Sequence, residues 1–423
     1  MAKRSLVPNL GAERLRICMF VSNDMLNDPR VARHAETLGL NGANVTVLCP
    51  LTNRTRLREA RNGFEIRRVP NALSRFTKAF LDPRKQPSFE RNSTGTSSSQ
   101  PRVRLLARKR NLCWLRQVIF TLASMLTVQL TMMRDARRLN AHVYWANDLD
   151  TLHLAVFAAM FGRKVVYDSH ELWPDMLLGV PEFVRTMLRS LEKWLVKRAD
   201  FVITVNEFIA EVIESRYSLR APVRVIYNTP KRTISRPLKQ SRKRKYKVAL
   251  YQGLYMPERG LENLVEAAKH LHPDVRLVFR GYGILEGRLR SLSSAFSNVR
   301  FEEAVPMEKM IEAAASADLG VVAYVPSNLC NYLASPNKLF EYIQAGIPIA
   351  SSDIPFMRLM VLRKGIGVVF DPHDPVDIAN ALNRATRETE LSRYRRNLIP
   401  VAQEYCWENE SKKLLDIYEA LKT

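Results

Sequence analysis

The sequence predicts an α/β fold built from two doubly wound domains, each a mostly parallel sheet covered by crossover helices. Three observations support this prediction. Short apolar runs alternate with helix-like segments in the first half, the alternation restarts after a very basic connector, and 423 residues are enough for two domains. We therefore expect a first domain over 1–235, a linker over 236–247, a second domain over 248–404 and a last helix over 405–423.

The first half opens with an apolar run at 15–22, a polar loop, a helical pattern ending at Gly42 and a second apolar run, which together predict a β-α-β unit. The alternation breaks at 82–102, where Ser, Thr, Gly, Pro and charged residues predict a mobile surface loop. It then resumes with a helix expected over 110–138. The remaining elements of this half are the strands HVYWAND, KVVYDSH, DFVITVN and VRVIYN, with helices over 151–161 and 182–198.

The second half repeats the pattern. Its expected strands are VALYQGLY, VRLVFRGYG, NVRFEEAV, LGVVAYVP, IPIASSD and GVVF, with helices between them. The last predicted helix, over 409–421, has no strand after it, so it is free to pack back across the first domain.

Charge is distributed unevenly along the chain. The 65 Lys+Arg exceed the 42 Asp+Glu by 23, and this excess lies in the first half: residues 1–250 carry a net +25 and residues 251–423 a net −2. Such an excess favours an anionic partner. The five cysteines have no metal or disulfide spacing and no apolar export signal is recognisable, so we expect a reducing, cytoplasmic location. The uncharged run at 117–133 is too short and polar for a membrane span and predicts a buried amphipathic helix.

Two similar α/β domains predict a ligand site in the cleft between them, because open parallel sheets bind ligands at the carboxyl ends of their strands. Neither a GxGxxG nor a GxxxxGK[ST] loop is present, which argues against a dinucleotide oxidoreductase and a P-loop hydrolase. Phosphate groups must therefore be bound in another way.

The strongest motif is ASPNKLFEYIQAGIPIASSDIP, at 334–355. Ser335 as N-cap and Pro336 at the first helical position predict a helix start there. The next amides, at Asn337, Lys338 and Leu339, would then be available to a diphosphate. Glu341, less than two turns into the helix, could reach an attached ribose. The alternative is that Glu341 is an ordinary solvated helix residue.

This motif resembles the donor-binding segment of glycosyltransferase family 4. Those retaining enzymes have the GT-B fold, in which two Rossmann-like domains face a central cleft. Further stretches that agree in order and spacing are DPRVARHAETLGLNGANVTVLC, YDSHE, ADFVITVN, YQGLYMPERGLENLVEAAKHL, RGYG and YCWENESKKLLDIYEAL. The resemblance implies that the second domain binds a nucleotide sugar, that the first domain binds the acceptor, and that the last helix crosses back to the first domain.

The resemblance also implies roles for individual residues. Glu341 becomes the ribose-binding glutamate, Arg259 the cation on the donor diphosphate, with Lys338 beside it, and His170 the residue that approaches the transferred sugar. Arginine suits a diphosphate because its planar guanidinium matches phosphate oxygens and stays charged. The expected catalytic residues are thus His170, Arg259 and Glu341. The expected donor-binding residues are Arg259, Lys338, Glu341, Asn337, Ser335, Pro336, Gly253, Gly281 and Gly283.

The glycines have two interpretations. Gly281 and Gly283 follow an expected strand, where the lack of side chains would let the backbone approach the nucleotide closely. A simple tight turn is the alternative. The expected acceptor-binding residues lie in loops of the first domain: Asn23, Asp28, Arg30, Asn147, Asp148 and Glu171, the last of which could equally be a helix N-terminal carboxylate.

Two positions depart from the family pattern. Leu333 stands where most members have a first glutamate, eight residues before Glu341, and Leu254 stands where they have an arginine, five residues before Arg259. These departures leave the donor sugar and the level of activity open. Asp148-Leu149-Asp150 resembles a metal-binding Asp-x-Asp, but it lies in the wrong domain for that role, and we expect neither a metal nor a cofactor.

The charge excess predicts peripheral attachment to the inner face of the cell membrane, where the acceptor would be a lipid-linked or surface polysaccharide intermediate. The candidate cations recur along one helix: Arg185, Arg189, Lys193 and Lys197, supplemented by basic residues at 104–110 and 134–138. A merely solvated helix face is the alternative. Three other functions remain open: a noncatalytic nucleotide-sugar binder, a GT-B sugar epimerase, and a nucleic-acid-binding protein, which the absence of aromatic-plus-basic RNA motifs disfavours.

Overall fold

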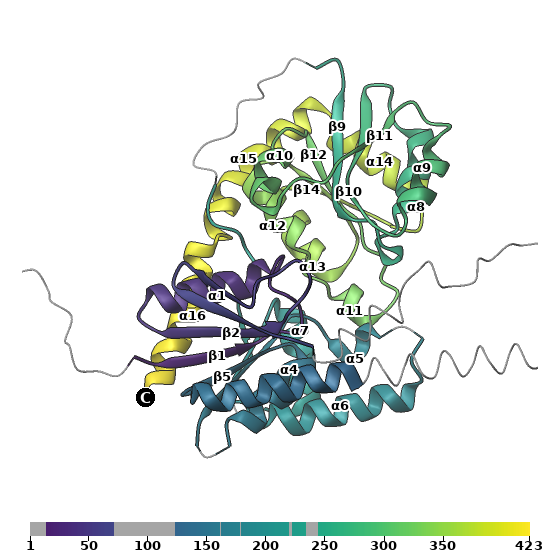
Figure 1. Cartoon of the computed structure of the whole chain (residues 1–423). Helices are drawn as coiled ribbons and strands as arrows, with labels where there is room; N and C mark the ends of the chain where they lie inside the picture. The colour runs from purple at the N-terminus through teal and green to yellow at the C-terminus, as the bar shows by residue number, and fades with distance from the viewer. Residues whose placement is uncertain (1–13, 72–122, 161, 178, 220–221, 234–243) are drawn as a thin grey trace, which may run out of the picture. The chain divides into compact units, whose positions relative to one another are not determined.

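The computed structural model describes residues 14–71, 123–160, 162–177, 179–219, 222–233 and 244–423 (Figure 1). They belong to two structural units, Met1–Val165 and Val166–Thr423, and the boundary falls inside strand β6 (Lys164–Ser169). The expected loop at 82–102, the basic residues at 104–110 and most of the linker at 236–247 lie outside the described residues. The expected domain limits therefore stay predictions.

The first unit contains a run of strands in the order β3-β4-β2-β1-β5. Neighbouring strands pair in parallel, except that β3 and β4 form an antiparallel hairpin around Asn62-Gly63. The β-α-β prediction is confirmed; the hairpin was missed, although Asn-Gly between two strands is a strong hairpin signal. The elements are β1 (Arg16–Phe20), α1 (Pro29–Leu40), β2 (Asn44–Pro50), β3 (Arg58–Arg61), β4 (Phe64–Val69), a helix over 123–139, β5 (Val143–Asn147) and α4 (Leu149–Ala158).

The second unit begins with three parallel strands, β6, β7 and β8. The helices around them include the predicted helix at 182–198, which is observed as α6. The strand expected at VRVIYN is reduced to two residues. The elements are β6, α5 (Trp173–Met176), α6 (Glu182–Val196), β7 (Phe201–Thr204), α7 (Glu207–Tyr217) and β8 (Arg224–Val225).

A six-stranded sheet follows in the order β11-β10-β9-β12-β13-β14, and all of its pairs are parallel. The prediction of a second doubly wound sheet is confirmed. Its elements are β9 (Lys247–Leu254), α8 (Leu261–Glu266), β10 (Val275–Tyr282), α9 (Glu286–Ser293), β11 (Val299–Glu302), α10 (Met310–Ala314), β12 (Leu319–Val322), α11 (Leu329–Tyr332), α12 (Asn337–Ala345), β13 (Ile349–Ser352), α13 (Pro355–Met357), β14 (Gly367–Phe370) and α14 (Pro375–Ala385).

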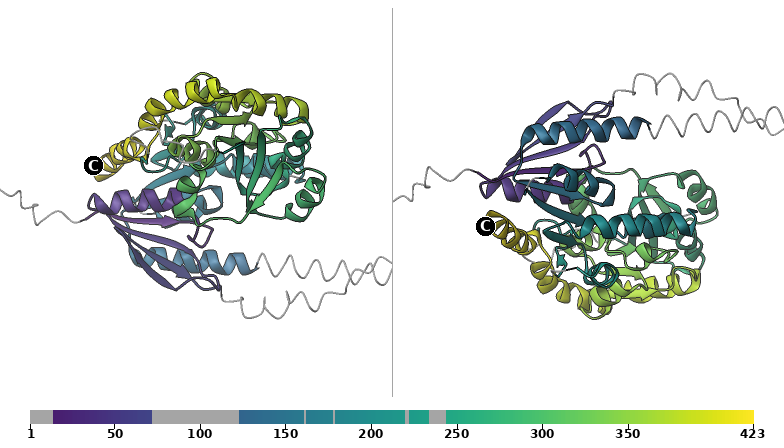
Figure 2. Two further views of the ribbon diagram at one scale, coloured as in Figure 1. Left: turned by 90° about the horizontal axis from the view of Figure 1, so that it is seen from above. Right: turned by 90° about the horizontal axis from the view of Figure 1, so that it is seen from below.

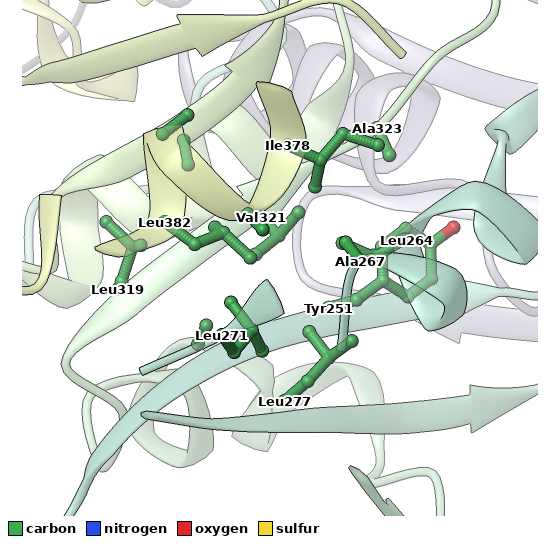
Figure 3. Packing of buried hydrophobic residues seen from close by; sticks show 14 of the residues in the cluster. Tyr251, Leu264, Ala267, Leu271, Leu277, Leu319, Val321, Ala323, Ile378 and Leu382 are labelled. Carbon is green, nitrogen blue, oxygen red and sulfur yellow. The ribbon is translucent and has the colours of Figure 1, made fainter. Parts of the chain in front are cut away.

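Both faces of this sheet are buried, because alternate residues of its strands enter two separate hydrophobic clusters. On β9, Ala249 and Tyr251 pack in one cluster with α8 and α14, while Val248 and Leu250 pack in the other with α12. Figure 3 shows Tyr251 among the residues of the first cluster. Burial on both faces is the usual condition of a parallel sheet. This burial explains why β9, β10 and β12 contain the apolar runs VALY, LVF and LGVV.

Two long helices, α15 (Glu388–Glu404) and α16 (Trp407–Lys422), close the chain and are coloured yellow in Figure 2. The Trp407 amide donates to the Pro230 carbonyl over 2.9 Å, and a buried Glu410 carboxylate oxygen accepts from the Tyr227 amide over 2.9 Å. The last helix therefore returns to the chain segment that follows β8, within the second unit, and its expected crossing to the first domain stays a prediction.

Gly281 faces Gly253 across the β9–β10 pair, and a Cβ built at Gly281 would lie 1.9 Å from the Gly253 carbonyl oxygen. We expect Gly281→Ala to lower the free energy of unfolding by about 2–3 kcal/mol, because a rigid backbone atom must move. At Gly287, in α9, a Cβ would meet no atom within 4 Å, and Gly287→Ala should add about 0.5–1 kcal/mol. Thermal unfolding of both ligand-free variants checks this expectation; equal midpoints would contradict it.

Candidate active site

A pocket of about 240 Å³ lies within the second unit, near the start of α12. Its walls come from the segment after β6, from the turn after β9, and from the segment between β12 and α12. Two of the expected catalytic residues, His170 and Arg259, line it together. The lining residues are His170, Glu171, Met176, Ile209, Glu258, Arg259, Tyr324, Asn328, Cys330, Asn331, Ala334, Ser335 and Pro336.

Arg259 ends a single 3-10 turn, Pro257–Arg259, which Gly260 terminates with a left-handed backbone (φ 61°). Glycine adopts this conformation without steric cost. The guanidinium carbon lies 3.8 Å from the centre of the Tyr324 ring, so the ring fixes the plane of the cation. Arg259 Nη1 is buried and has no hydrogen-bond partner in the described part of the chain. A positioned cation with an unused buried donor is suited to an anionic ligand.

The start of α12 differs by one residue from the prediction. Pro336, not Ser335, is the N-cap, the helix begins at Asn337, and the buried Ser335 hydroxyl makes no hydrogen bond to any described residue. The expectation that the Leu339 amide is available was wrong, because it donates to the Pro336 carbonyl over 3.1 Å. The predicted anion-binding role thus falls to the amides of Asn337 and Lys338. The Asn337 side-chain oxygen accepts from Asn228 Nδ2 over 2.7 Å.

Lys338 lies in the first turn of α12, with its amine 3.9 Å from the centre of the Tyr251 ring. Gly253 leaves the space for this amine, since a Cβ there would approach Nζ to 3.2 Å. The pKa of Lys338 is lowered to about 7, mainly by burial and then by the nearby charge of Arg259, while Glu341 opposes the shift. Arg259, Lys338 and Glu341 therefore form one electrostatic group, although only Arg259 lines the pocket itself.

His170 follows β6 directly. Its Nε2 lies 3.5 Å from a carboxylate oxygen of Asp168, which is fully buried in the strand. The two side chains form an ion pair only if the imidazole is protonated. Beside it, a Glu171 carboxylate oxygen lies 3.7 Å from the Cys330 thiol. The structure thus brings Glu171, expected in the acceptor site, to the same pocket as Arg259.

The three predicted donor-site glycines have a clear structural role. At Gly281 a Cβ would collide with the Gly253 carbonyl, and at Gly283 it would lie 2.4 Å from the Tyr255 carbonyl oxygen. Their absent side chains thus let β9 and β10 approach each other and the following turn. A role in nucleotide binding stays a prediction.

The other predicted acceptor residues belong to the first unit, where several have structural partners. Asp28 caps α1 by accepting from the Val31 amide over 3.1 Å, and it also accepts from Asn23 Nδ2 over 2.7 Å. Asn147 is buried and donates to the Phe20 carbonyl over 3.0 Å. Arg30 is buried, and Asp148 precedes α4 with a left-handed backbone, φ 68°. Their binding role stays a prediction.

Several pocket residues were missed from the sequence. Tyr324 lies just after the apolar strand β12, so the rule that ligands meet strand carboxyl ends could have indicated it. Glu258 precedes Arg259 within a motif already recognised. Asn328 is the N-cap of the short helix α11, which contains Cys330 and Asn331 and was not predicted from the sequence.

The predicted membrane cations on α6 fall into two pairs. Arg185 and Arg189 turn toward the protein: both form ion pairs with Glu182, and Arg189 also pairs with the buried Asp175 over 2.7 Å. Lys193 and Lys197 are exposed. Among the described residues, no helix is long and apolar enough to cross a membrane, and no cluster of three metal-ligating side chains occurs.

Family comparisons agree with this architecture. Residues 235–404 match the model described as glycosyl transferases group 1, and residues 96–229 match that of glycosyltransferase family 4. Together the two matched ranges span most of the chain. The resemblance inferred from the sequence motifs is confirmed.

The proteins similar to the chain include one curated relative and two solved structures. A Bacillus subtilis (strain 168) protein, provisionally assigned as the teichuronic acid biosynthesis glycosyltransferase TuaH, is 21% identical over 266 residues, covering 58% of this chain and 64% of its own. The match thus spans less than two thirds of that relative.

Sucrose-phosphate synthase of Thermosynechococcus elongatus has a TM-score of 0.66 at 16% identity, covering 96% of this chain and 99% of its own. Anabaena HepE, solved in complex with UDP-glucose, has a TM-score of 0.66 at 13% identity, covering 96% and 100%. At these identities the likeness shows the GT-B fold alone.

The Lys338 pKa predicts a pH dependence of stability. The folded protein releases this proton near pH 7, whereas the unfolded chain keeps it up to the ordinary value of 10.5. Over this interval the unfolded state binds more protons, so stability gained from Lys338 rises with pH. From pH 7 to 9 wild type should gain about 1–2 kcal/mol relative to Lys338→Met. The exposed Lys309→Met is the control for thermal unfolding; parallel wild-type and Lys338→Met profiles would contradict the expectation.

Proposed function

The chain belongs to the glycosyltransferases of family 4 with the GT-B fold, and from this premise we propose that it is a retaining hexosyl- or related transferase. It would move a sugar from a nucleotide-diphosphate sugar to a hydroxyl of a lipid-linked or surface polysaccharide intermediate. The observation that carries the proposal is the convergence of Arg259, Lys338 and the start of α12 beside His170. Retention of configuration rests on the family alone.

The positive charges of Arg259, Lys338 and the N-terminus of α12 would bind the diphosphate of the donor. A diphosphate would accept hydrogen bonds from the unused Arg259 Nη1 and from the first amides of α12, whose N-terminus carries partial positive charge. It would also relieve the repulsion between Arg259 and Lys338. Glu341 would bind the ribose hydroxyls one turn further along the helix. That Anabaena HepE was solved with UDP-glucose supports a nucleotide sugar as donor.

Transfer would break the bond between the anomeric carbon and the diphosphate oxygen. The leaving diphosphate gains negative charge at this step, and Arg259 with protonated Lys338 would stabilise it in a low-dielectric pocket. These cations would supply the stabilisation that a metal supplies elsewhere, so we propose a metal-independent reaction. The acceptor hydroxyl would form the new bond to the anomeric carbon and pass its proton to the leaving diphosphate oxygen, while His170, beside Asp168, would contact the transferred sugar.

The location we propose is the inner, cytoplasmic face of the cell membrane, attached peripherally. The net charge of +23 supports an anionic surface as partner, and such a surface would carry a lipid-linked acceptor. Acceptor candidates in the first unit remain Asn23, Asp28, Arg30, Asn147 and Asp148.

A second candidate, a noncatalytic nucleotide-sugar binder or an epimerase of the same fold, has one specific observation in its favour. Leu333 is buried, and its carbonyl accepts from Asn206 Nδ2 over 2.8 Å. This position therefore offers no carboxylate to a sugar. Release of nucleoside diphosphate from a bound nucleotide sugar separates the enzyme from the binder.

Donor binding is tested by the thermal stability of the purified protein with a panel of nucleoside diphosphates and nucleotide sugars. A bound ligand at 100 times its dissociation constant adds about 2.7 kcal/mol of stability. We expect one nucleotide class to raise the unfolding midpoint of wild type, and Arg259→Met and Glu341→Gln to weaken that ligand at least about tenfold. The matched controls are the exposed Arg300→Met and Glu303→Gln. No shift with any nucleotide would overturn the proposed function.

Catalysis is tested by release of nucleoside diphosphate from the nucleotide sugar identified in that panel, with water as acceptor. We expect His170→Ala to lower the turnover number about 100-fold while leaving donor affinity unchanged, because His170 would act on the transferred sugar and not on the diphosphate. The exposed His373→Ala serves as the control. Wild-type binding without any product release, with or without membrane extract as acceptor source, would instead favour the noncatalytic binder.

A further inference from the structure

One face of α6 exposes large apolar side chains. Four of them recur along the helix with exposed fractions of 73%, 61%, 46% and 45%: Phe183, Met187, Leu191 and Trp194. We call these residues the α6 apolar stripe. Leu195, the neighbour of Trp194 on this helix, is buried, so α6 has a packed edge and an exposed edge.

The stripe cannot turn inward without breaking buried hydrogen bonds. Glu192, on the packed side of α6, accepts from the hydroxyls of Tyr167 in β6 and Tyr217 in α7. The Asp175 carboxylate bridges Arg189 of α6 and Arg216 of α7, with nitrogen–oxygen distances of 2.7 and 2.6 Å. These polar contacts fix the rotation of the helix, so exposure of the stripe is a property of the folded unit.

Basic side chains lie at the C-terminal end of α6, next to the stripe. Lys193 and Lys197 are exposed, and the Arg198 guanidinium carbon lies 3.7 Å from the centre of the Trp194 ring. An aromatic ring covered by an arginine, beside lysines on flexible stems, is the composition of side chains at a membrane interface. The stripe runs for about 17 Å along the helix, which suits a helix lying flat in the headgroup layer.

We propose that the α6 apolar stripe inserts into the headgroup boundary of an anionic lipid bilayer, with Lys193, Lys197 and Arg198 on the lipid phosphates. This inference specifies how the chain would bind the membrane named in the proposed function. It depends on the proposed function only for the identity of the acceptor. It changes the mode of attachment predicted from the sequence, because Arg185 and Arg189 already pair with Glu182 and Asp175. The sequence predicted electrostatic attraction of four cations to the membrane. The structure favours insertion of apolar side chains, assisted by three cations.

The test is co-sedimentation of the full chain with phosphatidylcholine vesicles, with and without an equal part of phosphatidylglycerol. We expect binding to the anionic vesicles, weakened at least about tenfold in the double variant Phe183→Gln with Met187→Gln. Lys193→Gln with Lys197→Gln should weaken it about tenfold and reduce its dependence on salt. Val376→Gln, which alters an apolar side chain 46% exposed on α14, is the matched control and should bind as wild type does.

Insertion is checked separately by quenching of tryptophan fluorescence with brominated lipid, which we expect Trp194→Phe to reduce strongly. Full binding of the Phe183→Gln, Met187→Gln variant, or wild-type protein that ignores anionic vesicles, would overturn the proposal. Concentration-dependent dimerisation that this variant abolishes would do the same, because a second copy of the chain would then cover the stripe. Nucleotide-induced thermal stabilisation, measured on the same variants, shows whether the donor site is intact, so failure of the two proposals is distinguishable.

Discussion

Two positive charges in a desolvated site are the constraint around which the candidate active site is arranged. Arg259 and Lys338 repel each other, and burial lowers the pKa of Lys338 to about 7 despite the opposing Glu341. The Tyr324 ring lies against Arg259 and the Tyr251 ring against Lys338, and these cation–π contacts offset part of the free-energy cost of desolvating the two cations. An anion at the start of α12 would bind both cations and restore the proton on Lys338, so ligand binding and proton uptake are coupled here.

The surrounding fold keeps this arrangement in place through contacts within the second unit. Asn206, which caps α7, donates to the Leu333 carbonyl, so the segment that follows β7 holds the chain leading into α12. Tyr227 packs against Phe340, Phe356 and Tyr405, with ring centres 5.7, 5.9 and 5.4 Å apart. His170 and Arg259 therefore belong to one continuously packed body, and their shared pocket does not depend on the placement of the first unit.

Sequence patterns predicted the sheets and most helices because apolar periodicity is a local property. They also indicated Arg259, Lys338 and His170 as site residues, by resemblance to a family more than by spacing, and the roles of these residues stay predictions. Failures were of two kinds. The cap was misplaced by one residue at Ser335, since Ser is a favourable N-cap and Pro a favourable first helical residue, and only the backbone shows that the helix begins one residue later. Side-chain contacts across the fold, such as Tyr324 under Arg259 or Glu171 near Cys330, depend on tertiary packing that no local pattern encodes.

The charge of α6 illustrates the same limit with a functional consequence. A stripe of four cations at four-residue spacing predicts an electrostatic surface, yet burial decides which charges reach solvent. Glu182 pairs with both arginines and the buried Asp175 pairs with Arg189, so these carboxylates hold the two guanidinium groups against the protein. Four apolar side chains of the same helix, those of the α6 apolar stripe, remain exposed. Because Glu192 and its two tyrosines fix the helix from beneath, their exposure is maintained by the fold, which is the property that a stable attachment surface requires.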